Sequence, residues 1–156
     1  MRTAVLILEN LRSVENTGSI FRTAEGLGVS KIICVGTTPT PLERFGRKRQ
    51  DFAKVSLGAE DLIEWEYVAT ENLEFTISNL QNQSFQIIAL ELTHESTSLK
   101  DAVAKNKFAL VVGNEVDGVS KEVLEISDDI VEIPMYGQKE SLNVSVSTGI
   151  ALFMLI

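Results

Sequence analysis

Residues 3–36 read TAVLILENLRSVENTGSIFRTAEGLGVSKIICVG, and this stretch decides the fold class. The apolar runs of residues 3–9 and 30–36 each predict a strand. Between them, residues 16–28 predict a helix, with Ile20, Ala24 and Leu27 on one stripe and glycines at its end. Neither strand alternates apolar with polar residues, which is typical of strands buried on both faces. The stretch therefore predicts a parallel sheet covered by helices.

The rest of the chain continues this alternation. Strands are predicted at residues 64–69, 85–91, 108–113 and 129–135, and helices at residues 70–83, 97–105, 120–127 and 141–156. The stretch that contains Pro39 and Pro41 predicts a loop. No internal repeat, low-complexity tract or linker divides the 156 residues. We expect one α/β domain over residues 1–156, with a mostly parallel sheet flanked by helices.

Composition excludes several kinds of site. The chain has one cysteine, Cys34, inside a predicted strand, and one histidine, His94. A His-based triad or a multi-His site cannot be built from these, and we expect no metal. The Walker A and G-x-G-x-x-G motifs of nucleotide-binding sites are both missing. A lone core thiol, and apolar runs too short to cross a bilayer, predict a cytoplasmic protein without a membrane anchor.

The net charge is −8, but one stretch is basic. Residues 43–54 read ERFGRKRQDFAK and hold Arg44, Arg47, Lys48, Arg49 and Lys54. A local basic patch on an acidic protein can follow a phosphate backbone, which makes these residues candidates for RNA binding. The same pattern is compatible with a solvated loop, and charge alone favours the loop.

Three polar loops each follow an apolar strand. They read NLRSVENTGS after residue 9, NEVDGVS after residue 113 and YGQKESLN after residue 135. Ligands of parallel α/β sheets bind outside the carboxyl ends of the strands, so these loops could form one site. Their glycines let a ligand approach the backbone closely. Ser141, Asn143 and Ser145 lead into the last helix with more small polar side chains than packing requires.

The same loops resemble the motifs of the SpoU family (TrmH-type) of RNA ribose 2′-O-methyltransferases, in the SPOUT superfamily. The matching stretches are ENTGSIFRTAEGLGV at residues 15–29, KVSLGAEDLIEW at 54–65, FALVVGNEVDGVS at 108–120 and IPMYGQKESLNVSVSTGIALF at 133–153. The resemblance implies a sheet whose C-terminal part is tied in a trefoil knot. It also implies S-adenosyl-L-methionine as cofactor, and a homodimer in which each active site is completed by the partner subunit.

The cofactor contacts implied by the resemblance are Leu90, Gly113, Ile133, Met135 and Leu142. An adenine ring needs flat apolar walls and a few backbone donors and acceptors. Ile133, Met135 and Leu142 would provide the walls. From the residues alone, core packing is the preferred explanation for Leu90 and Ile133, and turn geometry explains Gly113 while remaining compatible with cofactor binding.

The catalytic residues implied by the resemblance are Asn16, Arg22, Glu115, Ser141 and Asn143. On its helix, Arg22 points away from the apolar stripe, so it is available to a group outside this subunit's core. A guanidinium has a pKa above ~12, so we expect Arg22 to clamp the phosphate beside the target ribose rather than to act as a base. Glu115 either orders its own loop or helps to position Asn143.

The last helix ends in ALFMLI and is apolar on every face, which predicts that a partner subunit covers one side. Ile150, Phe153, Met154 and Ile156 are the candidate contacts.

We expect no separate RNA-binding domain, so the core domain would hold its RNA alone or with a partner protein. Because compact members of the family are often tRNA enzymes, we expect tRNA rather than rRNA as the substrate. Two other functions stay open: a non-catalytic dimeric RNA-binding or assembly module, and an S-adenosyl-L-methionine-binding protein that acts on another substrate.

Overall fold

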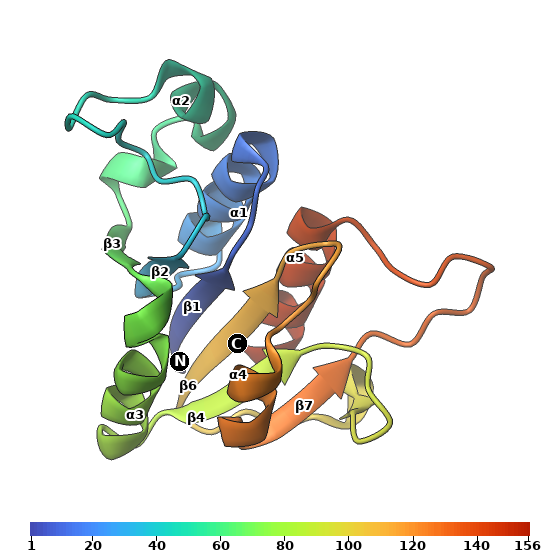
Figure 1. Cartoon of the computed structure of the whole chain (residues 1–156). Coiled ribbons are helices and arrows are strands. Elements are labelled where there is room, and N and C mark those ends of the chain that lie inside the picture. Colours follow the sequence, from blue (N-terminus) through green and yellow to red (C-terminus); the bar gives the residue numbers. More distant parts are fainter.

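A seven-stranded sheet forms the middle of the computed structural model, which describes residues 1–156 (Figure 1). The strand order is β3-β2-β1-β6-β4-β7-β5, and every pairing is parallel. The strands are β1 (Thr3–Glu9), β2 (Lys31–Val35), β3 (Glu64–Val68), β4 (Gln86–Leu90), β5 (Thr97–Ser98), β6 (Lys107–Gly113) and β7 (Asp129–Glu132). The predicted α/β fold class is confirmed, while the trefoil knot stays a prediction.

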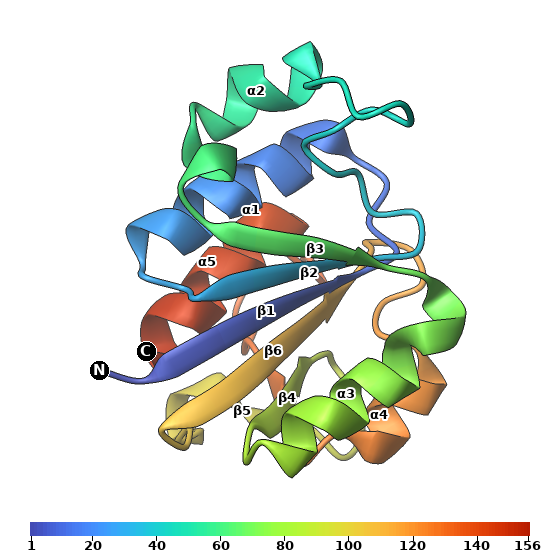
Figure 2. The same cartoon turned by 90° about the vertical axis from the view of Figure 1, so that its left-hand side faces the viewer.

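Helices cover both faces of the sheet, as Figure 2 shows. Helices α1, α2 and α5 pack on one face, and α3 and α4 pack on the other. The helices are α1 (Val14–Gly26), α2 (Gln50–Ser56), α3 (Leu73–Asn82), α4 (Lys121–Ile126) and α5 (Val144–Leu155), with 3-10 turns η1 (Ala59–Asp61), η2 (Thr70–Asn72) and η3 (Leu99–Asp101). Two apolar cores result, one on each side of the sheet.

Strand β1 lies inside the sheet, between β2 and β6, and its burial explains the unbroken apolar run of the sequence. Leu6 and Leu8 join the core under α1 and α5, whereas Val5 and Ile7 join the core under α3 and α4. All four are buried, because successive side chains of a strand point to opposite faces and both faces here are covered.

The first strands of the chain are added on one side of β1, and the later strands are added on its other side. Strands β2 and β3 follow on one side of β1, and β4, β7 and β5 lie beyond β6 on the other. Glu9 is paired with Gly113 where β1 and β6 end. The carboxyl ends of β1 and β6 therefore meet at the switch point, the place where doubly wound sheets bind ligands.

The helix predicted over residues 97–105 is wrong. Only β5 and the single turn η3 form there, and Ala102 is already extended at φ −76° and ψ 139°. Tertiary contacts override the local preference: β5 pairs with the edge of β7, and Arg2 Nε donates to the Ala104 carbonyl at 3.0 Å. Leu99 and Ala104 are buried in the core by this extended path.

Helix α2 was not predicted, because its stretch belongs to the basic segment that charge alone assigns to a loop. Phe52 explains the helix: its ring is buried and meets Phe21 of α1 edge to face, with centroids 5.0 Å apart. Two predicted boundaries also shift. Strand β7 ends at Glu132 rather than at residue 135, and α5 begins at Val144 rather than at residue 141.

Cys34 lies in the core, where burial raises the pKa of its thiol to about 12 and keeps it unreactive. None of the helices combines the length and the apolar character needed to cross a membrane. Nowhere do three or more His, Cys, Asp or Glu side chains gather in a way that could hold a metal ion.

Candidate functional site

Asn16 and Glu115 come together at the carboxyl edge of the sheet. Ser13 caps α1 and accepts a hydrogen bond from the backbone N–H of Asn16 at 3.1 Å, which fixes the first turn of the helix. From this turn, Asn16 Nδ2 donates to Glu115 Oε1 at 2.6 Å. The contact joins the first turn of α1 to the loop after β6.

Asn143 adds the loop after β7 to this contact. Its Oδ1 caps α5 and accepts from the backbone N–H and the hydroxyl of Ser145, at 2.9 and 2.6 Å. Its Nδ2 donates to Asn16 Oδ1 at 3.1 Å. We name the hydrogen-bonded chain Glu115–Asn16–Asn143 the amide bridge, and it unites three of the five predicted catalytic residues.

The amide bridge has one polarity. The Glu115 carboxylate only accepts, so Asn16 must present its NH2 group to it and keep its oxygen for Asn143. Asn143 then has to donate to Asn16, which agrees with the use of its own oxygen as the cap of α5. A reversal of either amide would set two like groups against each other, so both side chains have a defined orientation.

Two carboxylates at the ends of strands accept hydrogen bonds from the loop at residues 114–120. Glu9, only 3% exposed at the end of β1, accepts from the backbone N–H and the hydroxyl of Ser120 at 2.7 and 2.6 Å. Glu91, directly after β4, accepts from the backbone N–H of Val119 at 2.9 Å. Neither glutamate is among the residues predicted from the sequence, although each of them ends an apolar run.

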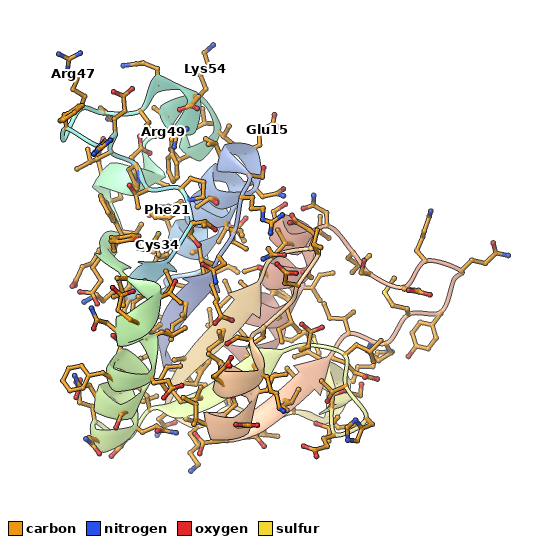
Figure 3. All side chains as sticks on the ribbon, in the orientation of Figure 1. Glu15, Phe21, Cys34, Arg47, Arg49 and Lys54 are labelled. Carbon is orange, nitrogen blue, oxygen red and sulfur yellow. The ribbon has the colours of Figure 1, made fainter.

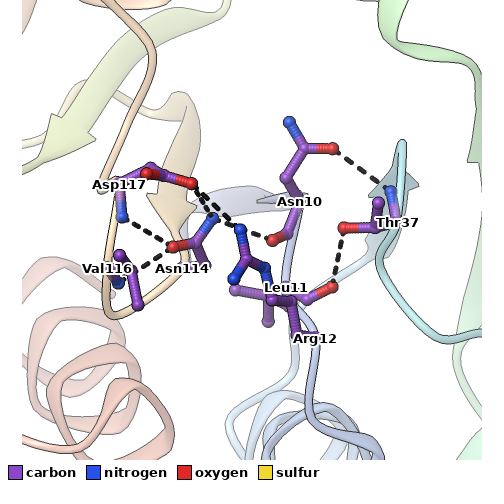
Figure 4. A network of polar contacts seen from close by, with 7 residues as sticks. All are labelled: Asn10, Leu11, Arg12, Thr37, Asn114, Val116 and Asp117. Atoms are coloured by element: carbon purple, nitrogen blue, oxygen red, sulfur yellow. Dashed lines mark hydrogen bonds and ion pairs between the residues drawn. The ribbon is translucent and has the colours of Figure 1, made fainter.

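Asn114 fixes the same loop from the side (Figure 4). Its Oδ1 accepts from the backbone N–H of Asp117 at 2.7 Å, and its Nδ2 donates to the Asn10 carbonyl at 3.1 Å. Arg12 pairs with Asp117 at 3.2 Å, and Asn10 Oδ1 accepts from the backbone N–H of Thr37 at 3.2 Å. The loops after β1, β2 and β6 are thereby tied into one surface.

Two adjoining hollows, of about 360 and 380 Å3, open beside the amide bridge. Both are lined by Leu90, Glu91, Glu115, Ser141, Leu142 and Ser147. The first also reaches Gly113, and the second reaches Ile133 and Met135. All five predicted cofactor contacts therefore lie around one space, together with the predicted catalytic residues Glu115 and Ser141. Each hollow has the size of a small-molecule site.

Comparison with known proteins identifies the family of this chain. The family described as "SpoU rRNA Methylase family" matches residues 3–153. The chain belongs to the SpoU rRNA methylase family.

Relatives in this family act on different RNAs, by their names. The tRNA (guanosine(18)-2′-O)-methyltransferase of Aquifex aeolicus is 32% identical, over 96% of this chain and 66% of the relative. The 23S rRNA (guanosine-2′-O-)-methyltransferase RlmB of Xanthomonas axonopodis pv. citri is 35% identical, over 97% of this chain and 57% of the relative.

Solved SpoU structures share the fold. An AdoMet-bound rRNA methyltransferase from Sinorhizobium meliloti superposes with a TM-score of 0.85 at 27% identity, over 97% of this chain and 55% of that one. The A. aeolicus TrmH/SpoU tRNA modifying enzyme gives a TM-score of 0.84 at 30% identity, over 99% of this chain and 74% of that one.

This chain spans 66% or less of the length of these two curated relatives. The single-domain organisation without a separate RNA-binding domain therefore stays a prediction.

Arg22, another predicted catalytic residue, lies outside the amide bridge. It is exposed on α1, away from the buried Ile20 and Ala24, as its position on the helix predicted. Its neighbour Thr23 packs against Gly149 of α5. A Cβ added at Gly149 would lie 3.4 Å from the methyl group of Thr23. The Arg22 side chain is thus exposed to solvent close to the contact between α1 and α5.

The five candidate RNA-binding residues fall into two groups. Lys48 pairs with Asp61 at 2.9 Å, and this hydrogen-bonded pair raises the pKa of Lys48. Arg49 pairs with Asp51 at 2.9 Å and holds the pKa of that carboxyl below its usual range. The remaining three, Arg44, Arg47 and Lys54, are exposed and form no ion pair, and Figure 3 shows Arg47 and Lys54 extending away from the ribbon.

Gly113 supports the site because a side chain there would strike the loop behind it. A Cβ added at Gly113 would lie 2.1 Å from the carbonyl carbon of Gly118. Because this neighbour is a backbone atom, the loop itself would have to shift. We expect Gly113→Ala to lower the free energy of unfolding by roughly 1–3 kcal/mol, as other overpacked sites do. Urea unfolding measures this loss.

Gly137→Ala is the matched control, since nothing lies within 4 Å of a Cβ at this position. It should change the free energy of unfolding by less than about 0.5 kcal/mol. Equal stability of Gly113→Ala and the wild type would show that the loop at residues 114–120 is not packed as described.

Proposed function

We propose that this chain binds S-adenosyl-L-methionine in the two adjoining hollows and transfers its methyl group to a ribose 2′-hydroxyl of RNA. The amide bridge carries the proposal. It joins Asn16 of α1 and Asn143 before α5 to Glu115, which lines both hollows. Membership of the SpoU family, and relatives named as RNA 2′-O-methyltransferases, support the same reaction.

The lining of the hollows fits this cofactor. Leu90, Ile133, Met135 and Leu142 are half-buried apolar side chains that can face an adenine ring. Ser141 and the backbone of the surrounding loops offer polar groups at the rim. Apolar walls with a few convergent polar groups are the usual construction of such sites. When bound, the cofactor supplies a methyl group already activated by its sulfonium.

The amide bridge would position the ribose. The Asn143 oxygen accepts the hydrogen bond that caps α5, and one of its N–H groups donates to Asn16. Its second N–H is therefore free to donate to a ribose oxygen. Asn16 likewise keeps one N–H free, because the other is held by Glu115. Glu115 thus acts as a positioning group in this proposal. Held amides of this kind bring the hydroxyl into line with the methyl group at little entropic cost.

Arg22 would act as a fixed cation. Because its pKa lies above ~12, it keeps its protons and clamps the phosphate next to the target ribose. The hydroxyl proton leaves to a phosphate oxygen or to water as the new C–O bond forms and the C–S bond breaks.

A homodimer would complete the site. Val146, Ile150, Phe153 and Met154 are exposed on α5 at spacings of four, three and one, so they form a single apolar face. Ile156, also expected in the interface, is half-buried and packs against the chain's own core instead. The exposed face adjoins the seam with α1, so a second copy seated on it would bring Arg22 near a partner's hollows.

The proposed substrate is tRNA or 23S rRNA, and tRNA is tested first. Relatives named for each RNA match this chain almost equally, at 32% and 35% identity. We place the reaction in the cytoplasm, where a buried free thiol such as Cys34 persists.

Methylation of RNA by the purified chain tests the function. The protein is incubated with methyl-labelled S-adenosyl-L-methionine and total RNA, and methylated riboses are mapped. Label on one ribose position of tRNA or 23S rRNA supports the proposal and identifies the substrate. Cofactor binding by calorimetry without any methylated RNA would favour the non-catalytic module instead.

Arg22→Ala should reduce kcat on the mapped RNA by about a hundredfold or more while cofactor affinity stays unchanged. The reason is that Arg22 contacts the RNA and not the cofactor. Glu25→Gln, at an exposed position of the same helix, should keep wild-type turnover. Wild-type kcat in Arg22→Ala would remove Arg22 from the mechanism.

Phe153→Asp should convert a dimer into a monomer, because it places a charge in the apolar face of α5. Phe153 is 73% exposed in the single chain, so the fold itself should tolerate the change. The matched control is Phe75→Asp on α3, at 70% exposure, which should stay dimeric. Light scattering measures both, and a wild-type monomer or a dimeric Phe153→Asp would contradict the interface.

Replacing Arg44, Arg47 and Lys54 together by glutamine should weaken RNA binding and reduce the dependence of log Kd on log salt by about two to three. These three cations have no carboxylate partner. Lys48→Gln should change the slope less, because Asp61 already neutralises this lysine. An unchanged slope in the triple variant would assign the segment to a solvated loop.

A further inference from the structure

The loop before α2 is a small hydrogen-bonded hairpin. Leu42 and Lys48 form an antiparallel bridge, the backbone N–H of Glu43 donates to the Arg47 carbonyl at 2.6 Å, and that of Gly46 donates to the Glu43 carbonyl at 2.9 Å. We call residues 41–49 the basic hairpin. Backbone hydrogen bonds therefore hold the tip of the hairpin in a defined position.

Ion pairs fix the basic hairpin to the body of the protein. Lys48 reaches Asp61 at 2.9 Å and Glu60 at 3.7 Å, and Arg49 pairs with Asp51 on α2. Two of the basic residues are thus used as anchors. The two that remain in the hairpin, Arg44 and Arg47, stand on either side of Phe45 in the sequence and are exposed.

Phe45 is 88% exposed at the tip of this anchored hairpin. Single exposed apolar residues are common and need no explanation by themselves. Here, however, the backbone that carries the ring is held by hydrogen bonds, the guanidinium carbon of Arg44 lies 5.8 Å from the ring centroid, and the exposed Arg47 follows two residues later. An aromatic face between arginines is the arrangement that stacks a nucleobase and holds its phosphates.

A wide, open hollow of about 970 Å3 lies beside the basic hairpin, between it and β3. Arg44, Thr40 and Tyr67 are among its lining residues. Tyr67 is 53% exposed, and its hydroxyl donates to the Gly36 carbonyl at 3.0 Å, which holds the ring in place. The hollow is polar enough to take a sugar and phosphates next to a base stacked at the tip.

We propose that Phe45, with Arg44 and Arg47, forms a subsite that stacks one unpaired nucleobase of the RNA substrate. This inference rests on the proposed function, because it takes RNA as the substrate. The hairpin follows β2, and the hollows of the methyl-transfer site follow β6 and β4. All these ends lie at the carboxyl edge, so one RNA strand can reach both places. An unpaired base is required, because bases in a duplex already stack on each other.

Binding of a defined oligonucleotide tests the subsite in the full chain. The probes are a labelled oligomer of about 12 uridines, which stays unpaired, and a duplex of the same length. Phe45→Ala should bind the single strand about five- to a hundredfold more weakly, the loss expected for one base–aromatic stack. Phe45→Trp should bind at least as well as the wild type, and Phe45→Leu should lose binding as Phe45→Ala does.

Salt titration separates stacking from charge. Phe45→Ala should keep the wild-type dependence on salt, whereas Arg44→Gln with Arg47→Gln should lower it. Wild-type affinity in both Phe45→Ala and Phe45→Leu overturns the subsite, as does equal weakening of the duplex or no binding of the single strand by the wild type. Self-association lost in Phe45→Ala without a change in RNA binding would assign the tip to a protein contact and also overturn it.

The two claims fail separately. Methyl transfer by the wild type together with unchanged binding in Phe45→Ala removes the subsite and leaves the proposed function. Binding that depends on the Phe45 ring, without any methyl transfer, supports the subsite and removes the proposed reaction.

Discussion

The cap that Asn143 places on α5 orients the rest of the candidate site. Its oxygen is committed to the first turn of the helix, so its NH2 group must turn towards Asn16. Asn16 then has only its own NH2 group to offer Glu115. A single helix cap thus sets the direction of every hydrogen bond in the amide bridge, and the bridge in turn holds the first turn of α1, the loop after β6 and the loop before α5 at one point.

The sheet makes this meeting possible. Because all strands are parallel, the loops that follow β1, β6 and β7 emerge at the same edge. Glu9 and Glu91 then draw the loop at residues 114–120 onto the strand ends, which leaves no room for a side chain at Gly113 or Gly118. The buried Glu9 and the half-buried Glu91 thus fix the loop, whereas the exposed Glu115 belongs to the amide bridge.

Much of this arrangement could be predicted from the sequence. Apolar runs such as residues 3–9 and 108–113 predict buried parallel strands, and three of the five predicted catalytic residues meet in the amide bridge. Other features depend on contacts that no local pattern contains. Residues 97–105 stay extended because Arg2 and β7 hold them, α2 forms because Phe52 meets Phe21, and two of five basic residues are neutralised by carboxylates distributed along the next segment.

The central claim is that the amide bridge works as one unit in methyl transfer. The most direct test is a double-mutant cycle of the single-turnover rate for Asn16→Ala, Asn143→Ala and the variant that carries both changes. If the two amides act through each other, the double variant should be no slower than the slower single variant. Losses that multiply, so that the double variant is slower by the product of both effects, would contradict the account.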